Sequence, residues 1–450
     1  MAGEAEMDSP PANAINWQTF QRKRWSIAVA AVVIQLCLGT VYGWSIIKNE
    51  LVAHHGWDEV GTSATFMLCI GVIGLSAAFG GILVDRKGPR LVATMAGVLF
   101  GIGTIIGGLG IATNNLPVLY LGYGLIAGIG NGLGYLTPIA TLIRWFPDKR
   151  GLVTGLAVMG FGAGAFFMGQ FAPGMLATWG AASTVCAWGL VFLVLIVIAA
   201  QWLENPLTSQ LPITAKSNIG QDEGESFNYG EALHTPQWWL EWGMLLLNIT
   251  AGIGLISQLS PIASDLYRPL VSSQLAGKDL SQAVDAAGGN VVAMAAVFNG
   301  LGRLMWSWLS DSLGRKKVFS IMFSTQAALY IFIPHINDYY IFMAVACYLL
   351  SCYGGGFATM PAFAADSFGT KQIGRIYGSM LTAWSVAGIL GPFTFAYVKQ
   401  STQNFAAALY ISSFLLALGF ILSRLYKKPS HRSWVHFTDT NKHIASRVRP

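Results

Sequence analysis

Arg303 is the residue of this sequence whose surroundings most restrict its chemistry. It lies in the apolar stretch 287–309, eight residues before Asp311, which places it about 12 Å from the end of the expected helix. A guanidinium this deep in a membrane costs roughly 2.5 to 3.5 kcal/mol, so such residues face a cavity or a partner. No acidic residue lies at comparable depth in any apolar segment. A soluble anion is therefore the simplest counter-charge, and a structural role, with the guanidinium bound to backbone carbonyls and water, is the alternative.

Polar and aromatic side chains in the apolar segments could complete an anion site around this arginine. Asn299 stands one helical turn before it and shares its face, so the amide could orient the guanidinium or bind a ligand oxygen. Gln35 and Tyr42 lie two turns apart in the first segment, and both carry donors that suit a carboxylate. Tyr135 and Tyr353 occupy similar places in the fourth and tenth segments. Tyrosines also pack in cores and at lipid interfaces, which is the alternative role for this set.

Twelve apolar segments must position these residues. The chain has 450 residues, of which 54% are hydrophobic and 11% charged, and this composition excludes a soluble protein. The segments run at 25–47, 61–84, 91–112, 116–143, 151–173, 181–203, 238–264, 287–309, 318–335, 339–364, 376–398 and 404–426. We therefore expect an all-α membrane protein whose twelve transmembrane helices form two pseudo-symmetric six-helix bundles.

Basic residues in the short loops indicate how the segments are oriented. Most of them fall on one side of the membrane, and by the positive-inside rule this side is cytoplasmic. The net charge of +6 is spread over short clusters between the spans, so we expect a lipid bilayer rather than nucleic acid as the partner. The expected division is a cytoplasmic tail at 1–24, bundles at 25–203 and 238–426, a cytoplasmic linker at 204–237 and a cytoplasmic tail at 427–450. We expect a monomer in the cell membrane.

A loop motif recurs at matching places in the two halves. GGILVDRKGPR at 80–90 corresponds to WLSDSLGRKK at 308–317, and each has an aspartate, then a glycine three residues later, then basic residues. Glycine permits a tight turn, and the aspartates could pair with basic groups of a neighbouring helix end. We expect these loops to latch the halves together and to open during a conformational change, although signals for membrane topology are the alternative. The predicted latch residues are Asp85, Arg86, Gly88, Arg90, Asp311, Gly314 and Arg315.

Other features of the sequence do not point to catalysis or to a cofactor. The five cysteines are scattered over different spans, so neither a disulfide framework nor a metal site follows. The glycine clusters in the fourth and fifth spans lack the lysine of a phosphate loop and favour close helix packing instead. An enzyme would need titratable groups that converge at one depth, and the spans hold no such pair. We expect no cofactor, no metal and no enzymatic activity.

The paired loops, with D-R-K-G-x-R after the second span and D-x-x-G-R-K after the eighth, resemble the major facilitator superfamily of secondary transporters. Within it, the chain resembles the oxalate/formate antiporter family and the related monocarboxylate transporters. This second resemblance is carried by LGTVYGWSI, RWFPDKRGLVTG, NGLGR, YGGGFATMPAFAADSFG and YGSMLTAWSVAGILGP.

The resemblance implies alternating access and a carboxylate substrate held by the arginine of the eighth span, here Arg303. The oxalate antiporter carries a second cation, a lysine in the eleventh helix, whereas this chain has Trp384 near that place, which disfavours a dicarboxylate. Animal proton-coupled monocarboxylate transporters carry an aspartate where this chain has Asn299. We therefore expect transport of a small monocarboxylate anion such as lactate, pyruvate or formate, by proton symport or anion exchange. An oxalate/formate-type antiporter and a solute sensor that does not transport are the alternatives.

Overall fold

The computed structural model describes residues 17–206 and 226–430, and in these ranges every regular element is a helix. The first half of the chain contains α1 (Trp17–Gly39), a 3-10 turn (Thr40–Gly43), α2 (Trp44–His55), α3 (Glu59–Lys87), α4 (Pro89–Ala112), α5 (Leu116–Leu119), a π-helical segment (Tyr120–Ala127), α6 (Gly128–Trp145) and α7 (Arg150–Ala200). The second half contains α9 (Tyr229–Leu233), α10 (Pro236–Val271), α11 (Gly277–Leu313), α12 (Arg315–Phe332), a 3-10 turn (Ile333–His335), α13 (Tyr339–Phe368), α14 (Ile373–Met380), α15 (Thr382–Thr402) and α16 (Ala406–Leu425).

Side chains that cap the first turn determine where several of these helices begin. Asp58, Asn115, Thr235 and Asp338 each precede a helix and accept a hydrogen bond from a backbone N–H three residues later. Such caps satisfy donors that the helix itself leaves unpaired. The short helix α9 lies within the predicted linker and has a capping box formed by Asn228 and Glu231.

The helices form a membrane-spanning protein. Ten helical stretches in the described part of the chain are long and apolar enough to cross a membrane. One of them, α7, has 51 residues and breaks at Gly180, whose φ of 74° is not helical. Its two parts are separate passes, because Trp145, just before α7, donates a hydrogen bond to the carbonyl of Glu204, just after it. With α11, which has 37 residues, the arrangement is consistent with the twelve predicted crossings.

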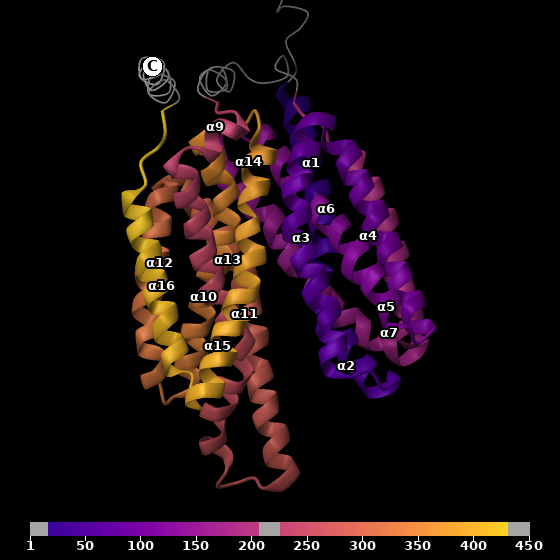
Figure 1. The fold of residues 1–450 in the computed structure, drawn as a ribbon, viewed down its shortest axis with the longest axis vertical. Helices are drawn as coiled ribbons and strands as arrows, with labels where there is room; N and C mark the ends of the chain where they lie inside the picture. The colour runs from indigo at the N-terminus through magenta and orange to yellow at the C-terminus, as the bar shows by residue number, and fades with distance from the viewer. Residues whose placement is uncertain (1–16, 207–225, 431–450) are drawn as a thin grey trace, which may run out of the picture.

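The two halves lie side by side and meet most closely at one end (Figure 1). The purple helices α1–α7 form one bundle, and α9–α16 form the other, with the hairpin of α10 and α11 extending beyond the remaining helices at the opposite end. The loops 86–90, 144–150, 315–317 and 371–375 lie at the end where the halves meet, which we call the basic end. There α3 is packed against α14, so closely that a Cβ added at Gly81 would overlap the carbonyl oxygen of Gly374.

Glycines end the helices in both repeated loops, as the sequence predicted. Gly88 and Gly314 have φ values of 81° and 89°, which side chains other than glycine rarely adopt. No atom lies within 4 Å of a Cβ added at either position, so a substitution there would test backbone strain alone. We expect Gly314→Ala to lower the free energy of unfolding by about 1 to 3 kcal/mol, measured as reduced thermal stability in detergent. Gly300→Ala, in the middle of α11 with equally open surroundings, is the matched control and should not lower it.

Candidate functional site

Arg303 is buried at the interface between the two halves. Its side chain extends from α11, and the residue is 1% exposed. Nε donates to Oδ1 of Asn299 at 3.3 Å, and Nη1 donates to the backbone carbonyl of Val158 in α7 at 3.2 Å. No carboxylate among the described residues forms an ion pair with this guanidinium. The absence of an acidic partner, which the sequence indicated, therefore holds for the described part of the chain, and the contact from Asn299 is formed.

Small residues on α7 allow the arginine to approach the opposite half. A Cβ added at Gly155 would lie 2.8 Å from the backbone oxygen of Arg303, and one at Gly162 would lie 3.7 Å from its Nε. These glycines belong to the fifth-span cluster, so the close packing predicted for that cluster occurs between the halves as well as within one of them.

Aromatic side chains from α6, α13 and the 3-10 turn after α1 lie around the guanidinium. Arg303 lies over the ring of Phe357 at 5.6 Å, and the hydroxyl of the half-buried Tyr42 also interacts with it. Tyr353 is 3% exposed and acts on the guanidinium electrostatically. The ring of Tyr135 stacks edge-on against Phe357, with a centroid distance of 5.8 Å. The structure thus brings together tyrosines that the sequence placed in three different spans.

Trp384 of α15 closes this cluster on the side of the second half. Its ring lies 5.1 Å from Phe357, 5.7 Å from Tyr135 and 6.4 Å from Phe161. The residue is 1% exposed. An aromatic wall therefore occupies the region where the oxalate antiporter resemblance would place a second cation.

Gln35 differs from the role expected of it. Its amide nitrogen donates to the backbone carbonyl of Tyr135 at 2.9 Å, so in this structure the donor holds α1 against α6. The amide oxygen of Gln35 is buried without a partner in the described chain.

Several donors around Arg303 are buried without a hydrogen-bond partner. They are the hydroxyls of Tyr135 and Tyr377 and the indole nitrogen of Trp384, all unpartnered within the described ranges. The two hydroxyls lie close enough to contact each other, although their geometry is not that of a good hydrogen bond. Buried donors in proteins are almost always paired, and unpaired ones indicate a bound ligand, ion or water. A cation with three such donors among aromatic rings is an arrangement suited to a small anion.

Tyr377 was missed by the sequence analysis. It lies in α14, is 1% exposed and acts electrostatically on Arg303. The sequence could have indicated it, because Tyr377 precedes Trp384 by seven residues. Residues two helical turns apart lie on the same face of a helix.

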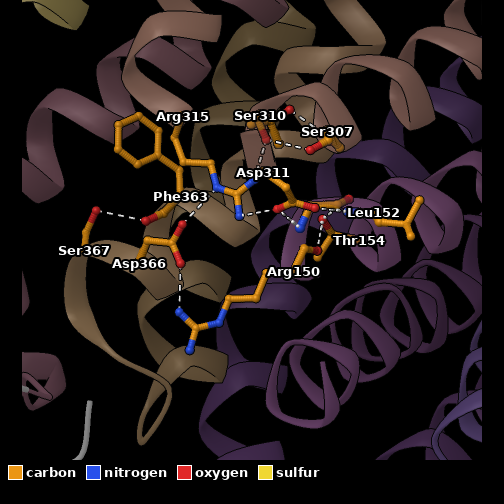
Figure 2. A network of polar contacts seen from close by, with 12 residues as sticks. Arg150, Leu152, Thr154, Ser307, Ser310, Asp311, Arg315, Phe363, Asp366 and Ser367 are labelled. Atoms are coloured by element: carbon orange, nitrogen blue, oxygen red, sulfur yellow. Dashed lines mark hydrogen bonds and ion pairs between the residues drawn. The ribbon is translucent and has the colours of Figure 1, made fainter. Parts of the chain in front are cut away.

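Two of the residues predicted to act as a latch, Asp85 and Asp311, contact the opposite half at the basic end, and Figure 2 shows the contacts of the second loop. Asp311 accepts hydrogen bonds from the backbone nitrogens of Gly151 and Leu152 at 2.8 and 2.9 Å. These nitrogens begin α7, so the carboxylate lies at the positive end of a helix in the other half. Arg315 also pairs with Asp311 at 2.7 Å.

Asp366 adds a second link that the sequence did not predict. Its carboxylate pairs with Arg150 of the first half at 2.7 Å and with Arg315 at 2.9 Å, so that one carboxylate joins two arginines from opposite halves (Figure 2). Repeated loops identified Asp311 and Arg315, but Asp366 and Arg150 lie outside the matched motif.

The first loop repeats this geometry through Asp85. One carboxylate oxygen pairs with Arg144 at 2.7 Å, and the other accepts from the backbone nitrogen of Arg375, near the start of α14, at 2.9 Å. Arg86 and Arg90 are exposed, and Arg90 pairs with Glu204 of its own half at 3.5 Å. Of the predicted residues in this loop, Asp85 is the one that contacts the opposite half in the described chain.

The described residues contain neither a candidate metal site nor a disulfide bond. No group of three or more His, Cys, Asp or Glu side chains there could hold a metal ion. The five cysteines, which all lie in the described ranges, are free.

Known proteins resemble this chain over most of its length. The model of the Major Facilitator Superfamily matches residues 25–277 and 253–446. An oxalate:formate antiporter from Oxalobacter formigenes is 29% identical, over 82% of this chain and 83% of the relative. The uncharacterized MFS-type transporter YhjX of Escherichia coli is 26% identical, over 82% and 87%. Human monocarboxylate transporter 11 is 25% identical, over 88% and 81%.

A solved structure has the same fold. The outward conformation of the transporter FucP superposes with a TM-score of 0.65 at 15% identity, over 89% of this chain and 99% of that one. The expected resemblance to oxalate/formate antiporters and monocarboxylate transporters is therefore confirmed at the level of the family. The protein is an integral membrane protein and belongs to the Major Facilitator Superfamily.

Proposed function

We propose that this protein is a secondary transporter of small monocarboxylate anions, such as lactate, pyruvate or formate, and that Arg303 binds the carboxylate. The observation that carries the proposal is a buried guanidinium at the interface of the halves with no acidic partner in the described chain. A carboxylate would supply the missing charge through a charge-assisted and potentially bidentate contact. The names of the relatives, which include a monocarboxylate transporter and an oxalate:formate antiporter, support the same class of solute.

The surroundings of Arg303 favour one carboxylate with a short body. The unpartnered donors of Tyr135, Tyr377 and Trp384 could bind the carboxylate oxygens or a hydroxyl group beside them. The rings of Phe357 and Trp384 offer an apolar wall to the rest of the molecule. Because no second cation belongs to this cluster of described residues, a dicarboxylate would leave one charge buried and unpaired.

Transport would proceed by alternating access. By the positive-inside rule the basic end faces the cytoplasm, so this state is closed on the cytoplasmic side by Asp85, Asp311 and Asp366. A carboxylate on Arg303 would contact both halves and shift the population toward an occluded state. The latch would then exchange its contacts for water as the basic end opens.

The proposal is tested by counterflow in proteoliposomes. Vesicles preloaded with unlabelled lactate, pyruvate or formate should accumulate labelled monocarboxylate, whereas oxalate should drive little accumulation and compete poorly, and the neutral lactamide should do neither. Exchange of a neutral or cationic solute in place of acids would contradict the proposal. A sensor would be recognised by thermal stabilisation with an acid and no counterflow.

Tyr377→Phe tests the contribution of an unpartnered donor. It removes a hydroxyl whose contact in the described chain is with the Tyr135 hydroxyl and is not a hydrogen bond of good geometry, so thermal stability should change little. Loss of one hydrogen bond to the substrate should weaken binding by about 1 kcal/mol, or about fivefold in KM for counterflow. Tyr330→Phe is the control, because the Tyr330 hydroxyl donates to the carbonyl of Ala251 inside one half. It should lower stability and leave KM unchanged, and the reverse pattern would contradict the assignment.

A further inference from the structure

Glu241 is a completely buried acid that the transport site does not use. It lies in the second turn of α10, at the basic end, and is 0% exposed. Oε1 forms a short contact with the hydroxyl of Ser367, the last residue but one of α13, and Oε2 has no partner in the described chain. No cation among the described residues pairs with it. An ionised carboxylate in this position would be strongly unfavourable.

A proton on Glu241 gives the hydrogen bonds around Ser367 a consistent arrangement. The Ser367 hydroxyl contacts Glu241, the carbonyl of Phe363 at 2.9 Å and the hydroxyl of Tyr426 at 2.6 Å. The serine has one proton, which can go to Glu241 or to the Phe363 carbonyl, and Figure 2 draws the contact with Phe363. Tyr426 then donates to the serine oxygen. When the serine proton goes to Phe363, the contact with Glu241 is a hydrogen bond only if the carboxyl group is protonated and donates.

Among the described residues, no neighbouring group supplies a positive charge that would stabilise an ionised Glu241. Burial raises the pKa of Tyr426, so its phenol stays protonated and acts as a donor. Asp366, the residue before Ser367, is negatively charged and so disfavours a second negative charge on Glu241. The arginines that pair with Asp366 are Arg150 of α7 and Arg315 of α12.

The other elements around this end of α10 place no cation on Glu241 within the described chain. Trp238 donates to the carbonyl of Ile376 in α14, and Trp242 donates to the hydroxyl of Thr382 in α15. After α16, the carbonyl of Tyr426 accepts from Lys316 of α12, whose ammonium group is thus bound to the backbone.

Ionisation of Glu241 would disturb the latch, because Glu241 and the latch both contact the end of α13, through Ser367 and Asp366 respectively. A buried carboxylate with one oxygen unpaired would have to be hydrated, which requires the segment around Ser367 to move. Asp366 immediately precedes that serine and holds Arg150 of the opposite half at 2.7 Å. We propose that Glu241 is a proton-binding site whose occupancy keeps the basic end closed, and whose deprotonation releases Asp366 from Arg150 and favours opening.

The sign of the pH dependence follows from linkage. The closed state needs the proton on Glu241, so it binds this proton more tightly than the open state does. The proton therefore stabilises the closed state at acidic pH, and this contribution is lost as the pH rises. The proposal concerns the conformational equilibrium and does not depend on which solute is carried.

Distance measurements between the halves test the proposal without any substrate. Lys87 of α3 and Lys371, in the loop before α14, are exposed on opposite halves at the basic end. In the double variant Lys87→Cys/Lys371→Cys, spin labels should attach selectively to the two introduced cysteines. Four native cysteines are buried, and Cys186 is only partly exposed. The short-distance population should dominate at acidic pH and decline as the pH rises. A distance distribution that does not change with pH would overturn the proposal.

Substitutions of the acid decide whether Glu241 is the group responsible. Glu241→Gln keeps the shape and stays neutral, so the halves should remain close at every pH. Asp265→Asn removes an exposed carboxylate from the same helix and should follow the wild-type protein. Should Glu241→Gln fail to fold, Glu241→Asp retracts the carboxyl from Ser367 and should move the midpoint of opening to more acidic pH. A Glu241→Gln protein that opens like the wild type, or a Glu241→Asp midpoint that does not move, would refute the assignment.

Discussion

Arg303→Ala should abolish carboxylate counterflow while the protein remains folded. If a substrate carboxylate is the counter-charge of the guanidinium, its removal leaves that carboxylate buried without a cation. Such a loss costs about 3 to 5 kcal/mol, which corresponds to a reduction in affinity of roughly 100-fold to several thousand-fold. Stability should change little, because the guanidinium forms hydrogen bonds and a ring contact but no ion pair inside the described chain. Initial rates of labelled lactate uptake and thermal midpoints in detergent measure the two effects.

Arg303→Lys separates the contribution of the positive charge from that of the guanidinium shape. Lysine keeps the charge but loses the planar fork that matches a carboxylate and the contact of the guanidinium with Phe357. We expect it to be nearly as inactive as Arg303→Ala. The matched control is Arg22→Lys, at an exposed position near the start of α1, which should transport at the wild-type rate. An Arg303→Ala protein that exchanges lactate normally would mean that the arginine only supports the packing of the bundle.

The fold was largely predictable because a membrane leaves few options. Backbone groups in hydrocarbon must be paired within helices, so long apolar segments define the elements. Basic loops and the repeated aspartate–glycine pattern located Asp85, Gly88, Asp311 and Gly314, whose geometry follows from local turn chemistry. The depth of Arg303 was likewise evident from its distance to the end of its segment.

The contacts between the halves were less predictable because they depend on tertiary packing. Asp366 stands among apolar residues at the end of its span, and nothing nearby in the sequence indicates that it contacts Arg150, 216 positions away. The direction of the Gln35 amide depends on where the Tyr135 carbonyl lies. Helical periodicity was sufficient to connect Tyr377 with Trp384, so that omission was avoidable.

The second large effect is expected at Gly81, far from Arg303. Because an added Cβ would overlap the carbonyl oxygen of Gly374 and lie 2.9 Å from the backbone nitrogen of Arg375, Gly81→Ala should prevent the closure seen here. That nitrogen donates to Asp85, so the latch bond of the first loop should be lost as well. The protein should therefore populate the state with an open basic end and lose most of its counterflow, although the groups around Arg303 are unchanged.

Gly71→Ala on the same helix provides the comparison, since a Cβ there has no atom within 4 Å. Both substitutions exchange glycine for alanine within α3, so they change its helix propensity alike. Spin labels at the basic end should report a longer distance in Gly81→Ala and an unchanged distance in Gly71→Ala. An acid that raises the thermal stability of the wild-type protein should also raise that of Gly81→Ala. If Gly81→Ala closed and transported like Gly71→Ala, the approach of α3 to α14 could not be what closes the basic end. Closure would then have to rest on the carboxylates of Asp311 and Asp366, which contact the opposite half independently of Gly81.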